Sequence, residues 1–491
     1  MSKHDQGTDL DLIIIGAGIA GINAAYRYQE SSPGKRSYAV LEARESIGGT
    51  WDLFRYPGIR SDSDIFTFAF QWNPWPRKEA LADGHDIKQY LIDSATKTGI
   101  IKHIRLGHKV TSIDWQSEAS RWKVTTSSPG SAKEPATTLY SRFIYLATGY
   151  YDYDEPLQTT IPGIGDFQGD VIHPQFWPAD YDYTGKNVVV IGSGATAVTI
   201  VPSMTDRAAH VTMLQRSPTY IFPLPSRGAL SSAIFAALPW ALAYWLHRVG
   251  WILQTIFMIA ACRAWPRLSR RYIRYESARL LPAGVPWDPH FNPRYKPWEQ
   301  RLCASKDGDI FAALRSGKAS VVTDTISAVG KNSISLASGE TLYPDTIVTA
   351  TGLKLLFAGG MRVTVDGTDK DYAKSFLWKG TMLQDVPNLF FTIGFENAAW
   401  TLGCDCAALL AVRVIKDMDR QKARVAVPRL DAASAGSMTP KPLFSLSATY
   451  LQKVNEELPK AGTGVWGPRT NYLVDLWKTQ YGDVETCLEM R

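Results

Sequence analysis

The fold is decided by the stretch DLDLIIIGAGIAG, which occupies residues 9–21. Its apolar run ends in three isoleucines and predicts a buried strand, and the glycine spacing G-x-G-x-x-G predicts a tight turn and a helix start. Gly16 and Gly18 permit the turn and the close approach of a pyrophosphate, and Gly21 lets the helix pack on the strand. Because N–H groups at a helix start attract phosphate, the stretch indicates a dinucleotide site.

The strand predicted next indicates which dinucleotide fits this turn. Residues 38–41 are apolar and lead into Glu42. A carboxylate at this place accepts hydrogen bonds from both ribose hydroxyls and repels a 2′-phosphate, so the first site suits FAD or NAD rather than NADP. The alternative is an ordinary strand, turn and helix whose second strand ends in a surface glutamate.

A second strand and turn of this kind follow at residues 186–197. The turn has the spacing G-x-G-x-x-A and consists of Gly192, Ser193, Gly194, Ala195, Thr196 and Ala197. The next predicted strand, 211–214, leads not into an acid but into Gln215, Arg216 and Ser217. A guanidinium and a hydroxyl bind a 2′-phosphate by several hydrogen bonds, so the second site suits NADPH. The alternative for Arg216 is a solvated charge at a strand end.

The segment between the two turns carries a further pattern. Residues 167–178 read FQGDVIHPQFWP and fit F-x-G-x-x-x-H-x-x-x-W-P through Phe167, Gly169, His173 and Trp177. By itself, a glycine, a histidine before a proline and two aromatic residues in an extended segment indicate a packed domain crossing.

A loop with regularly spaced aromatic and acidic residues follows the first unit. Residues 48–62 fit G-G-x-W-x-x-x-x-Y-P-G-x-x-x-D and include Thr50, Trp51 and Asp62. On its own this is a loop punctuated by glycine and proline around a buried tryptophan. Together with the pattern at 167–178, it resembles the motifs of the type I Baeyer–Villiger monooxygenases, the class B flavin monooxygenases. The stretches 50–64, 190–220 and 292–303 resemble the ethionamide-activating branch of that family.

The resemblance implies a fold, cofactors and an activity. The fold class is α/β, with two Rossmann-like dinucleotide-binding domains, one for FAD and one for NADPH, and a helical insert in the NADPH domain. NADPH would reduce FAD, and a C4a-peroxyflavin formed with dioxygen would insert oxygen beside a ketone carbonyl to give an ester or lactone. The apolar insert favours an apolar substrate, and the resemblance suggests open-chain ketones.

The resemblance also assigns roles to particular residues. Arg301 falls where the family keeps its catalytic arginine, although Gln300 stands where many members have lysine. Asp62 would orient Arg301, since a neighbouring carboxylate holds a guanidinium fork. Thr50 and Trp51 would lie against the flavin, and the family places an adenine contact at the position of Val110; Asp62 is also expected beside the flavin. His173 and Trp177 would act on the motion of the domains.

We predict five segments in the chain. They are the first part of the FAD domain (1–150), the first part of the NADPH domain (151–228), the helical apolar and basic insert (229–290), the second part of the NADPH domain (291–344), and the second part of the FAD domain with the C-terminal segment (345–491).

The composition indicates in which cellular compartment the protein works and which kinds of partner it binds. The five cysteines lack the spacing of a disulfide framework or a metal site, and the polar residues 1–8 show no signal peptide, so we expect a cytoplasmic protein without a metal. Residues 229–280 carry seven arginines and one glutamate, which equals the chain's net charge of +6. This local excess in an apolar segment indicates peripheral contact with a membrane rather than nucleic-acid binding, or a helical cover over the substrate cavity.

Three other functions fit parts of the same pattern. A flavin S- or N-oxygenase acting on sulfides or thioamides would use the same cofactors. A NADPH–flavin reductase would use the two nucleotide sites without oxygen transfer. A membrane-associated nucleotide-binding module would show no turnover.

Overall fold

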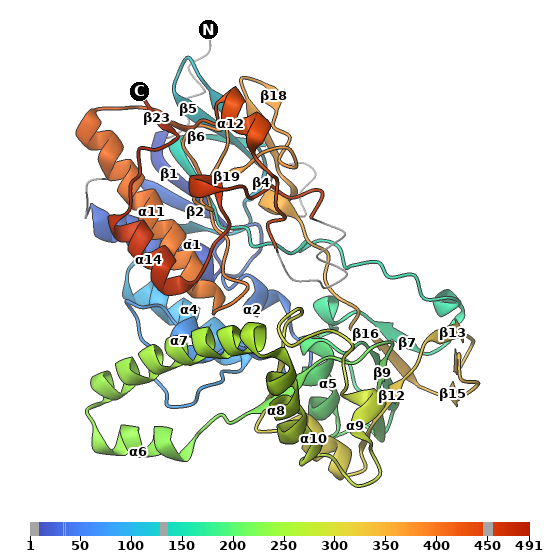
Figure 1. The fold of residues 1–491 in the computed structure, drawn as a ribbon. Coiled ribbons are helices and arrows are strands. Elements are labelled where there is room, and N and C mark those ends of the chain that lie inside the picture. Colours follow the sequence, from blue (N-terminus) through green and yellow to red (C-terminus); the bar gives the residue numbers. More distant parts are fainter. Residues whose placement is uncertain (1–8, 33, 35, 128–135, 445–454) are drawn as a thin grey trace.

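The computed structural model describes residues 9–491 apart from 33, 35, 128–135 and 445–454, so the polar start at 1–8 lies outside the described residues. The described residues form two large sheets, each flanked by helices, three small sheets of two or three strands, and a helical insert beside the large sheets (Figure 1). The predicted α/β fold with two dinucleotide-binding domains and a helical insert is confirmed.

The first sheet begins with the strand that the isoleucine run predicts. Strands β3, β2, β1, β6 and β21 are parallel, and β5 and β4 continue the sheet in antiparallel fashion. Its strands are β1 (Asp9–Ile15), β2 (Tyr38–Leu41), β3 (Ile104–Arg105), β4 (Lys109–Gln116), β5 (Arg121–Ser127), β6 (Thr137–Leu146), β17 (Arg362–Val365), β18 (Thr368–Asp369), β19 (Leu377–Trp378), β20 (Met382–Leu383) and β21 (Leu389–Phe391).

Helices from both ends of the chain cover this sheet. Helix α1 packs against α11, and α11 against α14, so the C-terminal part of the chain completes the first domain (Figure 1). The elements around the sheet are α1 (Ile19–Ser31), α2 (Thr50–Leu53), α3 (Ile65–Phe68), α4 (Gly84–Lys97), η1 (Ile100–His103), η4 (Phe357–Gly360), α11 (Trp400–Gln421), β22 (Ala426–Pro428), α12 (Ala432–Ser437), η5 (Gly464–Trp466), α14 (Tyr472–Tyr481) and β23 (Leu488–Met490).

The second sheet is smaller and wholly parallel, in the order β12-β9-β8-β16-β7. Its strands are β7 (Asp170–Ile172), β8 (Asn187–Ile191), β9 (His210–Gln215), β12 (Ala319–Thr323) and β16 (Thr346–Thr349). The elements around it are η2 (Ile164–Asp166), η3 (Pro174–Phe176), α5 (Ala195–Met204), β10 (Ile221–Leu224), α9 (Trp287–His290), β11 (Cys303–Lys306), α10 (Asp309–Arg315), β13 (Ile326–Val329), β14 (Ile334–Leu336) and β15 (Thr341–Leu342).

The pairing of strand β16 moves the boundary at which the chain returns to the first domain. We placed the last boundary between 344 and 345, but β16 pairs with β7 and β8 in the second sheet. The chain therefore leaves the second domain after Thr349. The reason is that β16 has the same apolar run and Thr-Gly ending as β6, and only strand pairing distinguishes their sheets.

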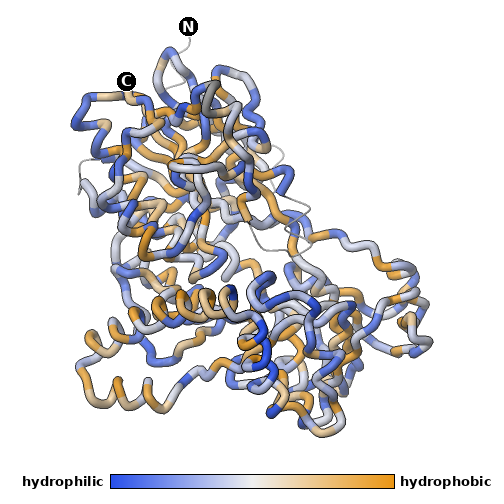
Figure 2. The backbone as a smooth tube through the Cα atoms, viewed as in Figure 1, coloured by the Kyte–Doolittle hydropathy of each residue, from blue (hydrophilic) through white to orange (hydrophobic). Residues whose placement is uncertain are grey.

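The insert consists of three helices that project beside the two domains. They are α6 (Ala229–Ala237), α7 (Trp240–Ala264) and α8 (Pro266–Ala278). Helix α7 packs on α3 of the first domain, and α8 packs on β10 of the second. The insert therefore touches both domains, and Figure 2 shows most of the tube of its first two helices in hydrophobic colours.

Candidate active site

The first dinucleotide turn is held by contacts that leave no room for side chains. Gly16 has a φ of +107°, and a Cβ there would lie 2.5 Å from the carbonyl oxygen of Ala147. A Cβ on Gly21 would lie 1.9 Å from the oxygen of Gly16. Gly18 precedes the 13-residue helix α1, and no side chain caps that helix start. Among the described residues no side chain therefore occupies the start of α1, and this helix N-terminus is open to a phosphate, which fits the pyrophosphate of FAD.

Glu42 lies at the end of β2 beside this turn. Its carboxylate accepts hydrogen bonds from the N–H of Ala17 at 2.8 Å and of Arg44 at 3.1 Å. The residue is buried, and this burial raises the pKa of its carboxyl group above the usual value. A fixed carboxylate that lines the cleft fits two ribose hydroxyls and opposes a 2′-phosphate.

The second turn repeats the backbone of the first with different side chains around it. Gly192 has a φ of +145° and no room for a Cβ, whereas a Cβ on Gly194 would meet nothing within 4 Å. Helix α5 begins after Gly194 without a side-chain cap. The hydroxyl of Ser193 donates to the carbonyl oxygen of Ser217 at 2.9 Å, which joins the turn to the end of β9. Arg216 is exposed there, so its guanidinium is available to a phosphate.

A cleft of about 540 Å³ joins the two turns. The predicted site residues that line it are Gly16, Gly18, Glu42, Thr50, Trp51, Asp62, Val110, Ala195, Thr196 and Arg301. The cleft thus runs from the first turn to the start of α5, as required for hydride transfer between two bound dinucleotides. The described residues that line the cleft include no cysteine, so no thiol faces the flavin position.

The structure brings Arg301 and Asp62 together across 239 positions of sequence. Nη2 of Arg301 donates to Oδ1 of Asp62 at 3.0 Å and to Oγ of Ser63 at 3.3 Å. The side chains are 45% and 29% exposed, and an ion pair so exposed contributes less than about 1 kcal/mol to stability. The contact with Asp62 therefore contributes little to stability. Its effect is to hold the guanidinium of Arg301 at the wall of the cleft.

The linker residues do not line the cleft itself, but the small cavity beside His173 shares Tyr56 and Thr196 with it. Gly169 is required by close approach, since a Cβ there would lie 2.4 Å from the oxygen of Asp345. His173 lines a small cavity with Tyr56, and its Nδ1 accepts a hydrogen bond from the N–H of Gln175 at 3.3 Å. Burial lowers the pKa of His173.

The two linker aromatics hold the segment in place. The ring of Trp177 is buried and meets Tyr181 edge-on at 6.0 Å, while Phe167 packs partly buried on the core of the second domain. None of the four linker residues is among the described residues that line the cleft, so their role in the motion of the domains stays a prediction.

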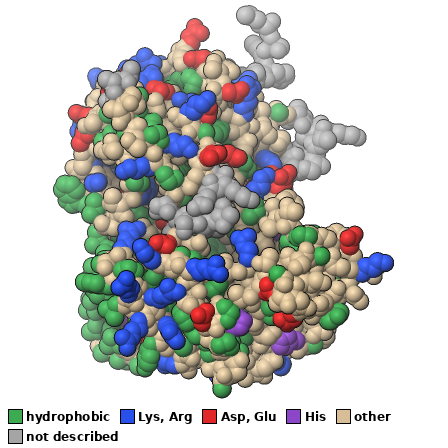
Figure 3. All heavy atoms as spheres, turned by 45° about the vertical axis from the view of Figure 1, so that its right-hand side comes forward, with side chains coloured by type: hydrophobic (Ala, Val, Ile, Leu, Met, Phe, Trp, Pro, Cys, Tyr) green, Lys and Arg blue, Asp and Glu red, His purple; other side chains and the backbone are tan. Residues whose placement is uncertain are grey.

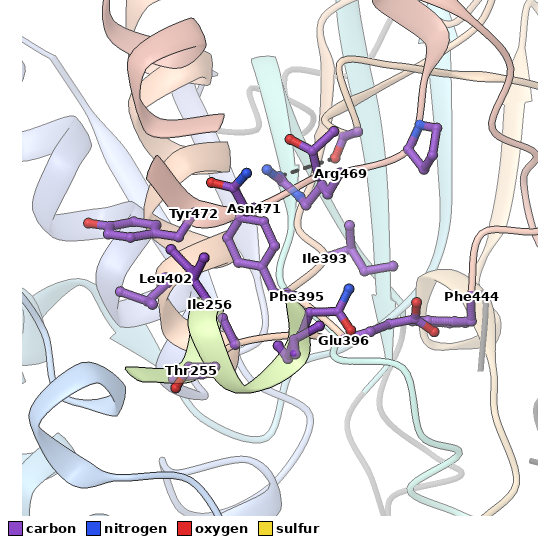
Figure 4. Close-up of a pocket in the computed structure, with 18 of the residues that line it drawn as sticks. Thr255, Ile256, Ile393, Phe395, Glu396, Leu402, Phe444, Arg469, Asn471 and Tyr472 are labelled. Carbon is purple, nitrogen blue, oxygen red and sulfur yellow. Dashed lines mark hydrogen bonds between the residues drawn. The ribbon is translucent and has the colours of Figure 1, made fainter. Parts of the chain in front are cut away.

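A second cavity, of about 640 Å³, adjoins the cleft and was not predicted. The two share Phe395 and Ala398. Figure 4 shows Arg469 and Asn471 of the C-terminal segment on one side of the cavity and Ile256 of α7 on the other. The side chains from 395, 469 and 471 come from loops without a motif, so no signal in the sequence indicated them.

The fold and these two turns define a class: an oxidoreductase with one site for a flavin dinucleotide and one for a nicotinamide dinucleotide phosphate. Residues 13–222 match the family model described as pyridine nucleotide-disulphide oxidoreductase. The chain is 43% identical over 487 residues to the FAD-containing monooxygenase EthA of Mycobacterium tuberculosis, covering 99% of this chain and 97% of that protein. It is 41% identical over 477 residues to the probable FAD-binding monooxygenase AlmA of Acinetobacter baylyi, covering 97% and 93%.

The chain therefore belongs to the family of FAD-containing monooxygenases that includes EthA, which confirms the family predicted from the motifs. Among solved structures it resembles a steroid monooxygenase bound to NADP, with a TM-score of 0.76, 19% identity, and coverage of 98% and 99%. It also resembles the OTEMO complex with FAD and NADP, with a TM-score of 0.74, 19% identity, and coverage of 99% and 100%. The predicted cofactors, FAD and NADPH, agree with these findings.

Proposed function

We propose that the protein is an NADPH- and dioxygen-dependent Baeyer–Villiger monooxygenase that converts apolar, open-chain ketones to esters. The observation that carries the proposal is the Arg301–Asp62 pair on the wall of the flavin cleft. When bound and reduced by NADPH, the flavin supplies activated dioxygen. The chain's own residues then determine which substrate the oxygen meets and which charges are stabilised.

Arg301 supplies a fixed positive charge where oxygen transfer to a carbonyl develops negative charge. A guanidinium held beforehand in a partly closed cleft stabilises such charge without reorganisation, and loss of one such donor costs about a hundredfold or more in rate. Asp62 holds the fork through Oδ1 at 3.0 Å and so orients the group rather than reacting. A reductase needs no such cation, which favours a monooxygenase.

The adjoining cavity supports the substrate class. Its walls include Ile252, Ile256 and Ile259 of α7 together with Leu402 and Phe444, so most of it accepts hydrocarbon. Because the cavity shares wall residues with the cleft, an alkyl chain lying there places its carbonyl near the flavin position. A volume of about 640 Å³ lies within the range of sites for small organic ligands.

The test is product analysis with 2-octanone, NADPH and air, beside methyl phenyl sulfide as a competing sulfur substrate. We expect hexyl acetate as the product, and in Arg301→Ala a fall in ester formation of at least about a hundredfold while NADPH still reduces the flavin. The matched control is Arg77→Ala, since Arg77 forms an ion pair with Asp86 that is comparably exposed, 55% and 27%, and neither residue lines the cleft.

Other products would replace the proposal. Sulfoxide without ester would make the protein an S-oxygenase that uses the same cofactors. Hydrogen peroxide without either product would make it a reductase or oxidase. An Arg301→Ala variant with normal ester yield would remove Arg301 from the chemistry.

A further inference from the structure

The insert presents a wide apolar surface to the outside. From Ala229 to Cys262 the only charged residue is Arg248, and it is buried. The large exposed side chains of α6 and α7 are Leu230, Trp240, Leu242, Trp245, Leu246, Val249, Leu253 and Phe257. Leu230 is 75% exposed and Phe257 is 69% exposed, which is unusual for such side chains on a soluble domain.

The opposite face of α7 is fixed to the protein. The Arg248 guanidinium donates to the carbonyl oxygens of Phe66 and Ala69, and the Tyr244 hydroxyl donates to that of Phe66. Further along, the face formed by Ile252, Ile256 and Ile259 lines the substrate cavity.

Helix α7 is the one helix of the described chain long and apolar enough to cross a membrane, and only 17% of its most apolar window is buried. Because one of its faces is bound to the first domain, the helix lies against the protein with the other face bare. This arrangement suits a helix that lies along a membrane rather than one that spans it.

Helix α8 adds positive charge and aromatic rings beside this face. Arg267, Arg271 and Arg274 follow each other at helical spacings of four and three, and Leu268, Tyr272 and Tyr275 form the neighbouring exposed row. Among the described residues, none of these three arginines forms an ion pair. Figure 3 shows hydrophobic side chains along the lower left edge of the molecule and a group of Lys and Arg side chains beside them.

We propose that the outer face of α6, α7 and α8, the insert face, binds the surface of an anionic lipid bilayer. Apolar side chains would enter the headgroup region, and the arginines would meet lipid phosphates, each contributing to binding at an anionic surface. Exposed Trp and Tyr side chains such as Trp265 and Tyr272 are the residue types that favour this interface. A second copy of the chain is a poorer occupant, because a symmetric contact would bring two sets of arginines together.

The same helix joins this surface to the substrate cavity. Leu253 and Phe257 face outward, and Ile252 and Ile256 face the cavity, so only the thickness of α7 separates the bilayer side from the substrate site. We infer that lipophilic ketones reach the cavity from the bilayer along α7, and this inference rests on the proposed function. Substrates dissolved in water would not depend on this route.

Binding is tested by sedimentation of the flavin-loaded enzyme with vesicles. We expect association with phosphatidylcholine vesicles that contain about one third phosphatidylglycerol, weak association with pure phosphatidylcholine, and loss of binding at high salt. Arg267→Glu/Arg271→Glu and Leu253→Ser/Phe257→Ser should each lower the partition coefficient at least about tenfold. The control Lys102→Glu/Lys331→Glu makes the same change in net charge on other surfaces and should bind normally.

The route is tested by activity. We expect the Leu253→Ser/Phe257→Ser enzyme to oxidise soluble 2-octanone at the normal rate and vesicle-borne 2-pentadecanone at least about tenfold more slowly. Equal vesicle binding by all variants would overturn the membrane proposal, as would a dimer dissolved by Leu253→Ser/Phe257→Ser without vesicle binding. Lowered vesicle binding by the Leu253→Ser/Phe257→Ser enzyme with unaltered rates for both ketones would overturn the route alone. Failure of the proposed function would appear instead as no ester from either ketone while vesicle binding persists.

Discussion

At the first dinucleotide turn the residue that ends the neighbouring strand is a buried glutamate, whereas at the second turn the corresponding arginine is exposed. Glu42 is 6% exposed and tied to the backbone N–H groups of Ala17 and Arg44. Both turns confine their first glycine, but a Cβ on Gly194 would meet nothing within 4 Å, whereas one on the equivalent Gly18 would lie 3.6 Å from the Cα of Gly49. The surroundings of the first turn are therefore more enclosed than those of the second, and we expect the first cofactor to be held more tightly.

The largest expected effect is at the first turn. Gly16→Ala would put a Cβ 2.5 Å from a backbone oxygen at a φ of +107°, so we expect a loss of more than about 3 kcal/mol in stability and purification without flavin. Flavin absorbance per protein and thermal unfolding measure this. Gly165→Ala, where a Cβ meets nothing within 4 Å, should keep its flavin. A yellow, stable Gly16→Ala protein would show that the turn does not confine this glycine.

The next largest effect is expected for Glu42→Gln, which removes the charge of this side chain and keeps its size. Glu42→Gln keeps the size but weakens two hydrogen bonds from ribose, so the dissociation constant for FAD should rise about a hundredfold. Titration of deflavinated protein by fluorescence measures it. The apoprotein should lose only about 1–3 kcal/mol of stability at neutral pH, because the NH2 group of glutamine cannot accept the hydrogen bond from one of the two backbone N–H groups, Ala17 or Arg44. A large loss of stability would instead mark Glu42 as structural.

A smaller effect is expected at the second turn. Arg216→Gln should raise KM for NADPH about tenfold, leave kcat unchanged and leave KM for NADH unchanged, since water competes with an exposed guanidinium for the 2′-phosphate. Steady-state kinetics with both coenzymes measure it. Arg207→Gln, another exposed arginine of the same domain, is the control. An equal change with NADH would mean that Arg216 does not select the phosphate.

The smallest effect concerns the junction between the two regions. Burial lowers the pKa of His173, so the unfolded chain takes up its proton first as the pH falls. The free energy of unfolding should therefore fall below about pH 6.5, and His173→Gln should show a shallower fall. Urea unfolding at about pH 7 and about pH 5.5 compares the slopes. Equal slopes would show that other groups account for the pH dependence.

Sequence patterns predicted the strands and turns whose structure depends on residues close together in the chain. The run at 9–15 is β1, the run at 38–41 is β2, and the turns after β1 and β8 have the backbone that glycine spacing requires. The meeting of Arg301 with Asp62 was expected only from the family resemblance, since 239 residues separate them and neither has a local signal.

Features that depend on packing were not predictable in this way. The sheet of β16 follows from its partners β7 and β8 and not from its composition. Helix α7 is uncharged on nearly all sides, so no periodicity distinguished the face over the cavity from the exposed face. The cavity wall at Phe395 and Asn471 arises where loops from distant parts of the chain meet.

The position of β21 has a consequence for the order of synthesis. The strands of the second sheet all lie between 170 and 349, whereas the first sheet needs β21, which starts at Leu389, to cover residues 144–146 of β6. A ribosome needs on the order of tens of seconds to make the chain between the end of β6 at Leu146 and the start of β21 at Leu389. The strands of the smaller sheet are therefore all synthesised first, while the first domain still has an unpaired apolar strand edge, and such an edge is prone to pair with other chains.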